Sequence, residues 1–344
     1  MPKPNTQDDH PALLREQSTT RFFVLGSFVQ ACCWMVERLP IAGESVVASG
    51  LHIEPGGKGL NVAIGIARLA RQGEVSIVLG VGRDEPAAKV RQLLAYEGVV
   101  TDHVHGLAEQ SGYGSGHIAK SGANAIAVFA GPNLLLTEYH ADLARTSIVN
   151  ADLVYAQFET SQPVILRTLE LAKQAKKDRT PITVLNPSPW QDIKPELLQW
   201  VDVLVVNEIE AAQLLDLPYP LTGLELKVAC DLISTTLPKL WAKWPLTGHR
   251  YLVVTLGDKG SACFCSNGAV FFEPGFTVTA ADTTGCGDAF TGALCEALAS
   301  GQKPEQALRQ ANACGALVAS QTGVLSALPN LADLTVFLNR ESGR

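Results

Sequence analysis

Short apolar runs recur along the chain at intervals that suit buried β-strands. They are rich in Val, Ile, Leu and Phe, as strands buried on both faces are. The runs are Phe22–Leu25, Val75–Leu79, Leu153–Tyr155, Ile182–Leu185, Val203–Val206 and Leu252–Thr255. Between them lie segments with helix start signals, among them Asn61, Ser161 and Asn207. Alternating strands and helices predict an α/β fold with a mostly parallel central sheet.

One region breaks this alternation. Ser111–Phe129 carries three alternating glycines, a polar turn, and then alternating small and apolar residues, which is the pattern of a hairpin. The stretch Val36–Ile53 has β-branched residues without a helical period, and we expect it to pair with that hairpin. The two pieces predict a small β lid, at about residues 36–55 and 110–130, inserted into one domain.

The predicted α/β domain spans residues 21–330. Residues 1–20 are polar and lack the apolar run of a secretory signal, so we expect them to form a tail. Residues 331–344 are expected to hold the end of a C-terminal helix and a second tail.

Composition narrows the function classes. The chain has 344 residues, 47% of them hydrophobic, and a net charge of −7, which disfavours nucleic acid and anionic membranes as partners. The least polar stretch, Phe22–Val36, is interrupted by Ser27 and Gln30 and is too short for a membrane helix. The eight cysteines are scattered without zinc or redox spacing, which favours reduced thiols in the cytoplasm.

Several predicted strands end in polar residues at what should be one edge of the sheet. These ends are Gly26-Ser27, Gly80-Val81-Gly82, Gln157-Phe158-Glu159, Asn186-Pro187-Ser188, Asn207-Glu208-Ile209-Glu210 and Gly257-Asp258-Lys259-Gly260. Ligands of open parallel sheets bind beyond the carboxyl ends of the strands, so the pattern predicts a site built from many loops. The alternative is that loops are polar in any protein.

The richest motif is Asp282–Phe290 (DTTGCGDAF), a glycine-rich turn ahead of a predicted helix that closes at Gly301. The amides of Gly285, Cys286 and Gly287 would point with the helix dipole at one spot, which suits a phosphoryl group. Asp288 would then be a base that orients an attacking hydroxyl. The alternative is an ordinary Asp cap at the start of the helix.

A second glycine-rich turn, Pro55–Asn61 (PGGKGLN), differs from a nucleotide P-loop. His52 stands where the first P-loop glycine belongs, and Gly59 follows the lysine where Ser or Thr should bind metal. A dinucleotide-binding GxGxxG is also absent. Further on, Asn207-x-x-Glu210 has the spacing of a reciprocal helix cap, which alone says nothing of function.

Together these segments resemble the ribokinase-like family of sugar kinases, also called the PfkB family. The resemblance covers about Phe22 to Pro329 and implies a three-layer αβα fold with a β lid. It rests on VLGS at Val24–Ser27, PGGKGLN at Pro55–Asn61, QFE at Gln157–Glu159, LNPSP at Leu185–Pro189, VNEIEA at Val206–Ala211, TLGDKG at Thr255–Gly260 and DTTGCGDAF at Asp282–Phe290. The early GGKG-x-N with the late DTxGxGDxF is specific for the family.

The resemblance implies an ATP-dependent kinase that phosphorylates a hydroxymethyl group of a sugar, a sugar-like molecule or a nucleoside. Asp288 would be the base, with Gly285, Cys286 and Gly287 as the anion hole. The acceptor site would be lined by Gly56, Gly57, Lys58, Asn61, Glu159 and Asp288.

The same resemblance assigns residues to the nucleotide and to metal ions. The ATP-binding residues would be Asn207, Thr255, Gly257, Lys259, Gly260 and Asn312, with Asn312 near the adenine. Glu210 would act through Mg²⁺ and its waters. Asp282 and Thr284 would belong to a site for a monovalent cation such as K⁺.

The sequence departs from the family at Ala31, where members usually carry an aspartate that grips two sugar hydroxyls. Losing that carboxylate removes a charge-assisted hydrogen bond worth roughly 1.5–3 kcal/mol, which disfavours ribose itself as the substrate. Glu37 is a candidate substitute from the lid. The departure also leaves open a binding or sensing protein without turnover.

Two further expectations concern Cys286 and the lid. A thiol at a helix N-terminus can have a lowered pKa and oxidise, and the alternative is a small packing residue. The exposed strand edges of the lid need cover, so we expect the lid to close over the acceptor and to pair with a second chain in a homodimer.

Overall fold

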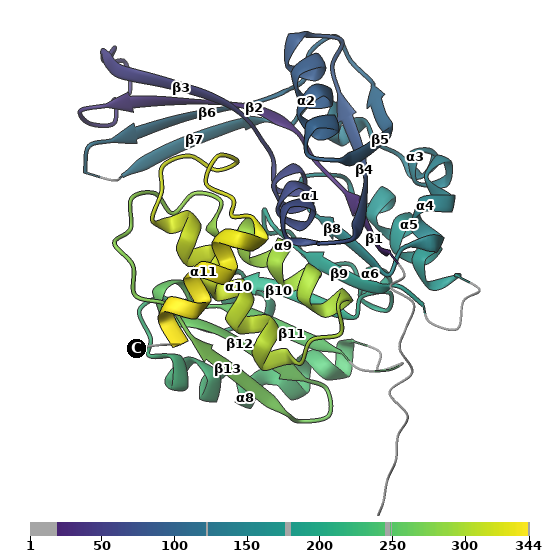
Figure 1. Cartoon of the computed structure of the whole chain (residues 1–344). Helices are drawn as coiled ribbons and strands as arrows, with labels where there is room; N and C mark the ends of the chain where they lie inside the picture. Colours follow the sequence, from purple (N-terminus) through teal and green to yellow (C-terminus); the bar gives the residue numbers. More distant parts are fainter. Residues whose placement is uncertain (1–18, 122, 176–179, 245–247, 249, 343–344) are drawn as a thin grey trace, which may run out of the picture.

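The six predicted apolar runs lie side by side in the middle of one sheet (Figure 1). The computed structural model describes residues 19–121, 123–175, 180–244, 248 and 250–342. In spatial order the nine strands of the large sheet are β13 (Val270–Pro274), β12 (Gly260–Cys265), β11 (Tyr251–Thr255), β10 (Val203–Asn207), β9 (Ile182–Asn186), β8 (Leu153–Gln157), β1 (Thr20–Leu25), β4 (Gly73–Val81) and β5 (Val99–Gly106).

The sheet is parallel from β11 to β5, and only β12 and β13 pair antiparallel at one edge. Three strands, β5 at one edge and β12 and β13 at the other side, are additions to the predicted set. Parallel strands need crossover connections, which the helices between them supply. The predicted α/β class is confirmed.

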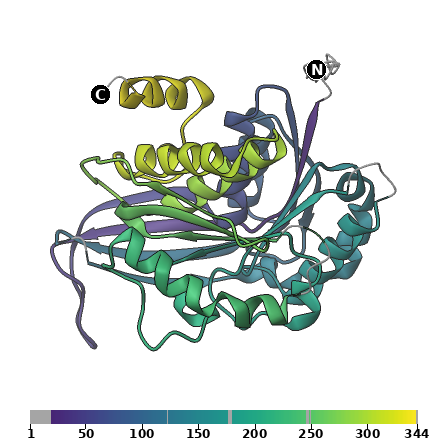
Figure 2. The same cartoon turned by 90° about the horizontal axis from the view of Figure 1, so that it is seen from below.

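Helices cover both faces of the large sheet, so that it forms the middle of three layers (Figure 2). On one face lie α1 (Lys58–Leu69), α2 (Glu85–Tyr96), α9 (Cys286–Ala299), α10 (Pro304–Ala319) and α11 (Leu331–Ser342). On the other lie α3 (Glu138–Leu143), α4 (Arg145–Asn150), α5 (Gln162–Lys173), α6 (Pro195–Leu198), α7 (Glu208–Leu214) and α8 (Leu226–Lys243).

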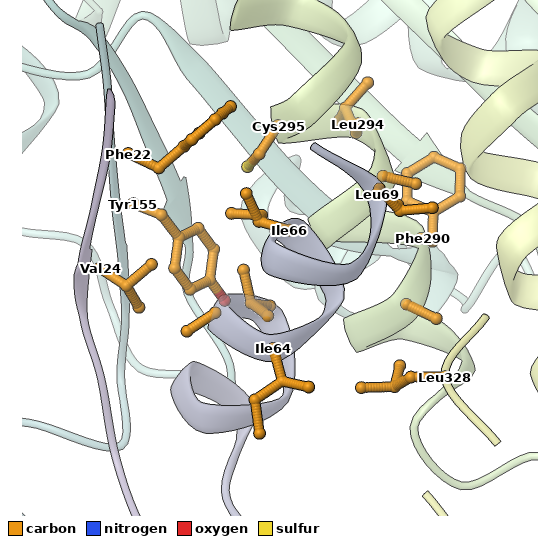
Figure 3. Close-up of a cluster of buried hydrophobic side chains, with 14 of the residues drawn as sticks. Phe22, Val24, Ile64, Ile66, Leu69, Tyr155, Phe290, Leu294, Cys295 and Leu328 are labelled. Carbon is orange, nitrogen blue, oxygen red and sulfur yellow. The ribbon is translucent and has the colours of Figure 1, made fainter. Parts of the chain in front are cut away.

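The two faces of the sheet are the two halves of the core. Along β1, Phe22 and Val24 pack into one cluster and Phe23 and Leu25 into the other, as the two-residue period of a strand requires. Each such buried side chain stabilises the fold by about 1.5–3 kcal/mol. On the α1 face, Tyr155 of β8 lies beside Val24 and Ile66 (Figure 3).

A second sheet of four strands projects from the body (Figure 1). In spatial order its strands are β3 (Ala48–Gly56), β2 (Val29–Val36), β6 (Gly112–Ala119) and β7 (Asn124–Phe129). Strands β6 and β7 form the antiparallel hairpin, and β2 pairs with both β3 and β6. We call this sheet the lid.

The lid begins at Val29 and not at about residue 36, where the sequence pattern placed its start. The apolar run Phe22–Val36 hides the break, because two strands of different sheets follow each other with only Gly26, Ser27 and Phe28 between them. Strand β3 then leads straight into α1.

The turn from β3 into α1 lies against the end of β1, which explains its glycines. A Cβ on Gly57 would lie 2.5 Å from the carbonyl oxygen of Ser27, and a Cβ on Gly59 would lie 2.3 Å from the Cα of Gly26. Gly57 also has a φ of 113°. Helix α1 begins at Lys58, so Asn61 stands inside its first turn and is not the cap that the pattern suggested.

The predicted N-terminal tail lies almost wholly outside the residues that the structure describes. Residues 1–18 and 343–344 are outside the described residues, and β1 begins at Thr20. At the C-terminus, where we expected the end of a helix and a tail, the structure has a whole helix, α11 (Leu331–Ser342). Within the described ranges, no helix is both long and apolar enough to cross a membrane.

Candidate active site

The predicted site residues come from the ends of neighbouring strands and from the first turns of helices. Ser27 follows β1, Glu159 follows β8, and Asn207 ends β10 directly beside Thr255 at the end of β11. Asn61 of α1 meets Asp288 of α9, 227 positions later in the chain. The fold therefore brings the two specific motifs of the sequence into direct contact.

Asp288 lies in the first turn of α9 but does not cap it. The cap residue is Gly285, in the left-handed region at φ 79°, and its glycine is required because a Cβ would lie 2.4 Å from Cγ1 of Val324. Asp288 stands three residues further on and is 8% exposed. The capping alternative for Asp288 is thus excluded, and its carboxylate is available for another use.

The carboxylate of Asp288 has two partners from α1. The side-chain amide of Asn61 donates to Oδ2 at 2.7 Å, and Nζ of Lys58 lies 3.9 Å from Oδ1. Burial raises the pKa of Asp288 above that of an ordinary Asp, while Lys58 and Asn61 act in the opposite direction. The result is a desolvated carboxylate held in place by a cation and an amide.

Oδ1 of Asn61 points the other way. Asn61 is 5% exposed, and Oδ1 has no hydrogen-bond partner within the described part of the chain. A buried acceptor without a donor costs about 1–3 kcal/mol. Less than 1 Å² of this atom is exposed, so a ligand would reach it only if neighbouring groups moved.

Glu159 fastens the glycine-rich turn to the sheet. Its Oε2 accepts from the hydroxyl of Ser27 at 2.5 Å and from the amide of Lys58 at 2.9 Å, and Ser27 in turn accepts from the amide of Gly59 at 3.2 Å. Burial raises the pKa of Glu159, although Ser27 and Lys58 oppose that rise. Glu159 positions Lys58, the residue that faces Asp288.

Lys58 is surrounded by carboxylates. Burial lowers its pKa, but Asp288, Glu159 and Glu210 outweigh that effect and the pKa ends above its ordinary value. Lys58 is therefore a cation throughout the neutral range, available to a phosphate or to the base.

The turn before α9 has the geometry of an anion site. The amides in the first turn of a helix lack intrahelical acceptors and carry the positive end of the dipole. A Cβ on Gly287 would meet no atom within 4 Å, so the side of this residue where a side chain would stand is open. Burial raises the pKa of the Cys286 thiol to about 11, which contradicts a reactive thiolate and favours packing.

Asn207 and Glu210 form the reciprocal cap that their spacing suggested. Oδ1 of Asn207 accepts from the amide of Glu210 at 2.8 Å, and Oε2 of Glu210 accepts from the amide of Asn207 at 3.0 Å. Glu210 is only 6% exposed, yet its charge reaches Lys58. The cap uses one oxygen, Oε2, and does not by itself prevent Glu210 from facing a metal through water.

The segment from Thr255 to Gly260 includes a 3₁₀ turn, η2 (Gly257–Lys259). Nζ of Lys259 lies 3.7 Å from Glu225. Asn312 of α10 is occupied by structural bonds: it accepts from the Ser261 hydroxyl at 2.9 Å and donates to the carbonyl of Glu273 at 2.9 Å. Both polar atoms of the Asn312 side chain are used by these bonds, so its predicted contact with an adenine would be a packing contact and not a hydrogen bond.

Asp282 and Thr284 lie together in the turn that leads to α9. Oδ1 of Asp282 accepts from the amide of Thr284 at 2.9 Å. In the described ranges no three His, Cys, Asp or Glu side chains gather as a metal cluster. An ion here would therefore need carbonyl oxygens, water or a ligand's phosphates among its donors.

Two residues near the site have roles that the sequence patterns did not assign. Ser27 connects Glu159 to α1, and only its place directly after β1 hinted at this. Tyr155 is fully buried, and its hydroxyl points toward the helix that carries Ile64 and Ile66 (Figure 3). Burial raises the pKa of Tyr155, and Asp288 and Glu159 add to that rise. Nothing in the sequence marks Tyr155 as different from its core neighbours.

The chain is similar in sequence to known proteins. A model of the pfkB family of carbohydrate kinases matches residues 19–331. The ribokinase of Haemophilus influenzae is 31% identical over 298 residues, which are 86% of this chain and 91% of that protein. The ribokinase of Bacillus subtilis is 30% identical over 92% of this chain and 98% of its own.

Solved structures agree in fold. An Arabidopsis thaliana ribokinase complexed with ribose and ATP matches with a TM-score of 0.82 and 26% identity, over 93% of this chain and 99% of that chain. A Burkholderia thailandensis nucleoside kinase in complex with inosine matches with a TM-score of 0.72 and 18% identity over 94% and 98%, a likeness that shows the fold alone. The chain belongs to the pfkB family of carbohydrate kinases.

Proposed function

We propose that the chain transfers the γ-phosphoryl group of ATP to a hydroxymethyl group of a sugar or sugar-like small molecule, with Asp288 as the base. The observation that carries the proposal is the contact of Asp288 with Asn61 and Lys58 at the start of α9. A desolvated carboxylate there can accept the proton of the attacking hydroxyl.

The phosphoryl group would lie on the amides of Gly285, Cys286 and Gly287. Charge develops on its oxygens as it passes between donor and acceptor, and fixed amide dipoles stabilise that charge without reorganising. Lys58 adds a positive charge on the acceptor side.

ATP would lie along the ends of β10 and β11. The adjacent Asn207 and Thr255 would face its phosphates, with Gly257, Lys259 and Gly260 beside the nucleotide. The buried Glu210 fits a Mg²⁺ ion that is held mainly by phosphates and water, because one carboxylate is enough for such a site. Asp282 and Thr284 would contribute to a monovalent cation site. Mg²⁺ supplies neutralisation of the phosphate charges when it is bound.

The lid would cover the acceptor and pair with the lid of a second copy. One lid face exposes Trp34, Leu51, Ile53 and Phe129, which are 37%, 48%, 55% and 58% exposed. Exposed apolar side chains on a projecting sheet favour an interface between copies of the chain.

A purified preparation with ATP, Mg²⁺ and K⁺ tests the proposal against a panel of sugars, sugar acids, polyols and nucleosides. We expect ADP release with at least one acceptor, and a product heavier by one phosphoryl group in mass spectrometry. No turnover with any acceptor, together with ligand-induced thermal stabilisation, would instead favour a binding protein. Ala31 is the residue that favours this second candidate.

A further inference from the structure

One face of the lid is turned toward the body, and beside Glu54 it carries small residues, with Val29 and Val128 as the larger side chains. Ala31 of β2 lies directly between Glu54 of β3 and Gly114 of β6. Directly opposite residues of a strand pair share a face, so these three belong together with Gly56, two positions after Glu54. A Cβ on Gly114 would meet nothing closer than 3.9 Å.

Among the described residues of this face, Glu54 is the one carboxylate. The side chain points at the body, because Oε1 accepts a hydrogen bond from the amide of Val324 at 3.1 Å. Val324 in turn is the residue that a Cβ on Gly285 would strike. Glu54 therefore lies between the lid and the turn of the proposed anion hole.

A second observation places the Glu54 charge in the same region. Burial raises the pKa of the Cys33 thiol, and Glu54 and Asp282 both add to that rise. Cys33 is two residues beyond Ala31 on the same face of β2, and Asp282 begins the turn that leads to α9. The carboxylates of Glu54 and Asp282 thus converge on one neighbourhood, next to the site.

Glu54 receives few hydrogen bonds for a carboxylate that is mostly buried. Its side chain is 13% exposed, and Val324 gives it one hydrogen bond within the described part of the chain. Its other oxygen, Oε2, lies 3.5 Å from Nε2 of the half-exposed His52, beyond ordinary hydrogen-bond length. A mostly buried carboxylate accepts up to about four hydrogen bonds and is stabilised by each donor that it gains.

We propose that Glu54 binds hydroxyl groups of the acceptor and selects an acceptor with two adjacent hydroxyls facing the lid. This rests on the kinase function proposed above. A vicinal diol offers two O–H donors at the spacing of one carboxylate. The other lid carboxylate considered from the sequence, Glu37, is 81% exposed and pairs with Lys120, so it does not reach the site. Ala31 and Gly114, which separate Glu54 from Val128 of β7, leave room beside the carboxylate for the sugar ring.

Glu54→Gln tests the proposal with the acceptor that the wild type phosphorylates best. Gln keeps a carbonyl oxygen for the Val324 amide but loses the charge, so we expect the KM for the acceptor to rise about 10- to 100-fold. The KM for ATP should change less than about twofold, because the nucleotide lies along other strands. Glu37→Gln is the matched control and should leave both values unchanged.

A deoxy acceptor and a rescue variant separate binding from a merely structural role. The penalty of Glu54→Gln should largely vanish for an analogue that lacks one of the two hydroxyls. Adding Ala31→Asp to Glu54→Gln should restore part of the affinity from the opposite strand. An unchanged KM in Glu54→Gln, or an equal penalty with the deoxy analogue, overturns the proposal.

If the protein is not a kinase, the wild type will turn over no acceptor in the panel. The role of Glu54 is then tested by measuring, with calorimetry, how tightly the wild type and Glu54→Gln bind the same compounds. Weaker binding by Glu54→Gln than by the wild type supports it. Equal binding by both, or no binding by the wild type, overturns it.

Discussion

Asp288 holds a charge where burial opposes it. Folding raises the pKa of this carboxyl, so the folded state binds its proton more tightly than the unfolded state does. Above the unfolded-state pKa, ionisation of Asp288 therefore costs stability, and below it the cost disappears. Lys58 and Asn61 offset part of this cost and fix the direction of the carboxylate.

The variant Asp288→Asn should lose turnover by about 10²- to 10⁴-fold, because the amide cannot accept the proton. ATP binding, measured by calorimetry, should survive. The unfolding temperature at pH 7 should not fall, since the variant removes a buried charge. Turnover within tenfold of the wild type would show that another group is the base.

The pH profile of kcat should have its acid limb above the range of an ordinary Asp carboxyl, because activity needs ionised Asp288 and burial raises its pKa. Asn61→Ala and Lys58→Met each remove a group that lowers this pKa. Both should move the acid limb to higher pH, whatever their effect on the rate itself.

Lys259→Met is the control for these profiles. Its ammonium pairs with Glu225 and Asp258, and it is not among the groups that shift Asp288. Its acid limb should coincide with that of the wild type. A shift equal to that of Lys58→Met would point to a general charge effect.

Helix α1 owes its position to the turn before it. Gly57 and Gly59 let the turn approach β1, and Glu159 and Ser27 bind it there. Three chain segments thus decide where Lys58 and Asn61 point: the turn itself, the end of β1 and the stretch after β8. An early helix start, at Lys58, is what places Asn61 on the face that meets α9.

Gly59→Ala should lower the free energy of unfolding by about 1–3 kcal/mol, because its Cβ would lie 2.3 Å from backbone that cannot move aside. Urea unfolding measures the change, and the KM for the acceptor should rise with it. Gly65→Ala in the same helix is the control, since a Cβ there meets nothing within 4 Å. That variant should gain about 0.5–1 kcal/mol. Equal stability of the two variants would contradict the close approach.

The lid exposes apolar side chains on both faces. Trp34, Leu51, Ile53 and Phe129 lie on one face, and Met35, Ile126 and Val128 lie on the face that carries Glu54. The proposed homodimer depends on the face of Ile53. Ile53→Lys places a charge among its exposed apolar side chains. We expect light scattering after size exclusion to show a shift from dimer to monomer at micromolar concentration.

Tyr96→Lys is the matched control for the dimer prediction. Tyr96 is 87% exposed at the end of α2, away from the lid strands. It should leave the mass in solution unchanged. A wild type that is monomeric at all concentrations would remove the dimer from the proposal.

The local sequence pattern predicts the central strands and singles out most of the candidate site residues. Runs such as Val203–Val206 are buried on both faces, so their composition alone marks them. Strands β5, β12 and β13 are absent from the predicted set. Strands β5 and β13 are partly exposed, and the buried β12 mixes Gly, Ser and Ala with larger residues, so none of the three is a continuous apolar run. The start of the lid at Val29 escaped because apolar residues continue across the break between the two sheets.

The printed chain, read alone, establishes the α/β class, the two glycine-rich turns and the resemblance to sugar kinases, because these depend on residues close together in sequence. Folding decides what lies far apart in sequence: the bond of Asn61 to Asp288, the burial that raises the Asp288 pKa, and the position of Glu54 opposite Ala31. Burial and cross-strand register are properties of packed neighbours, and no local pattern contains them.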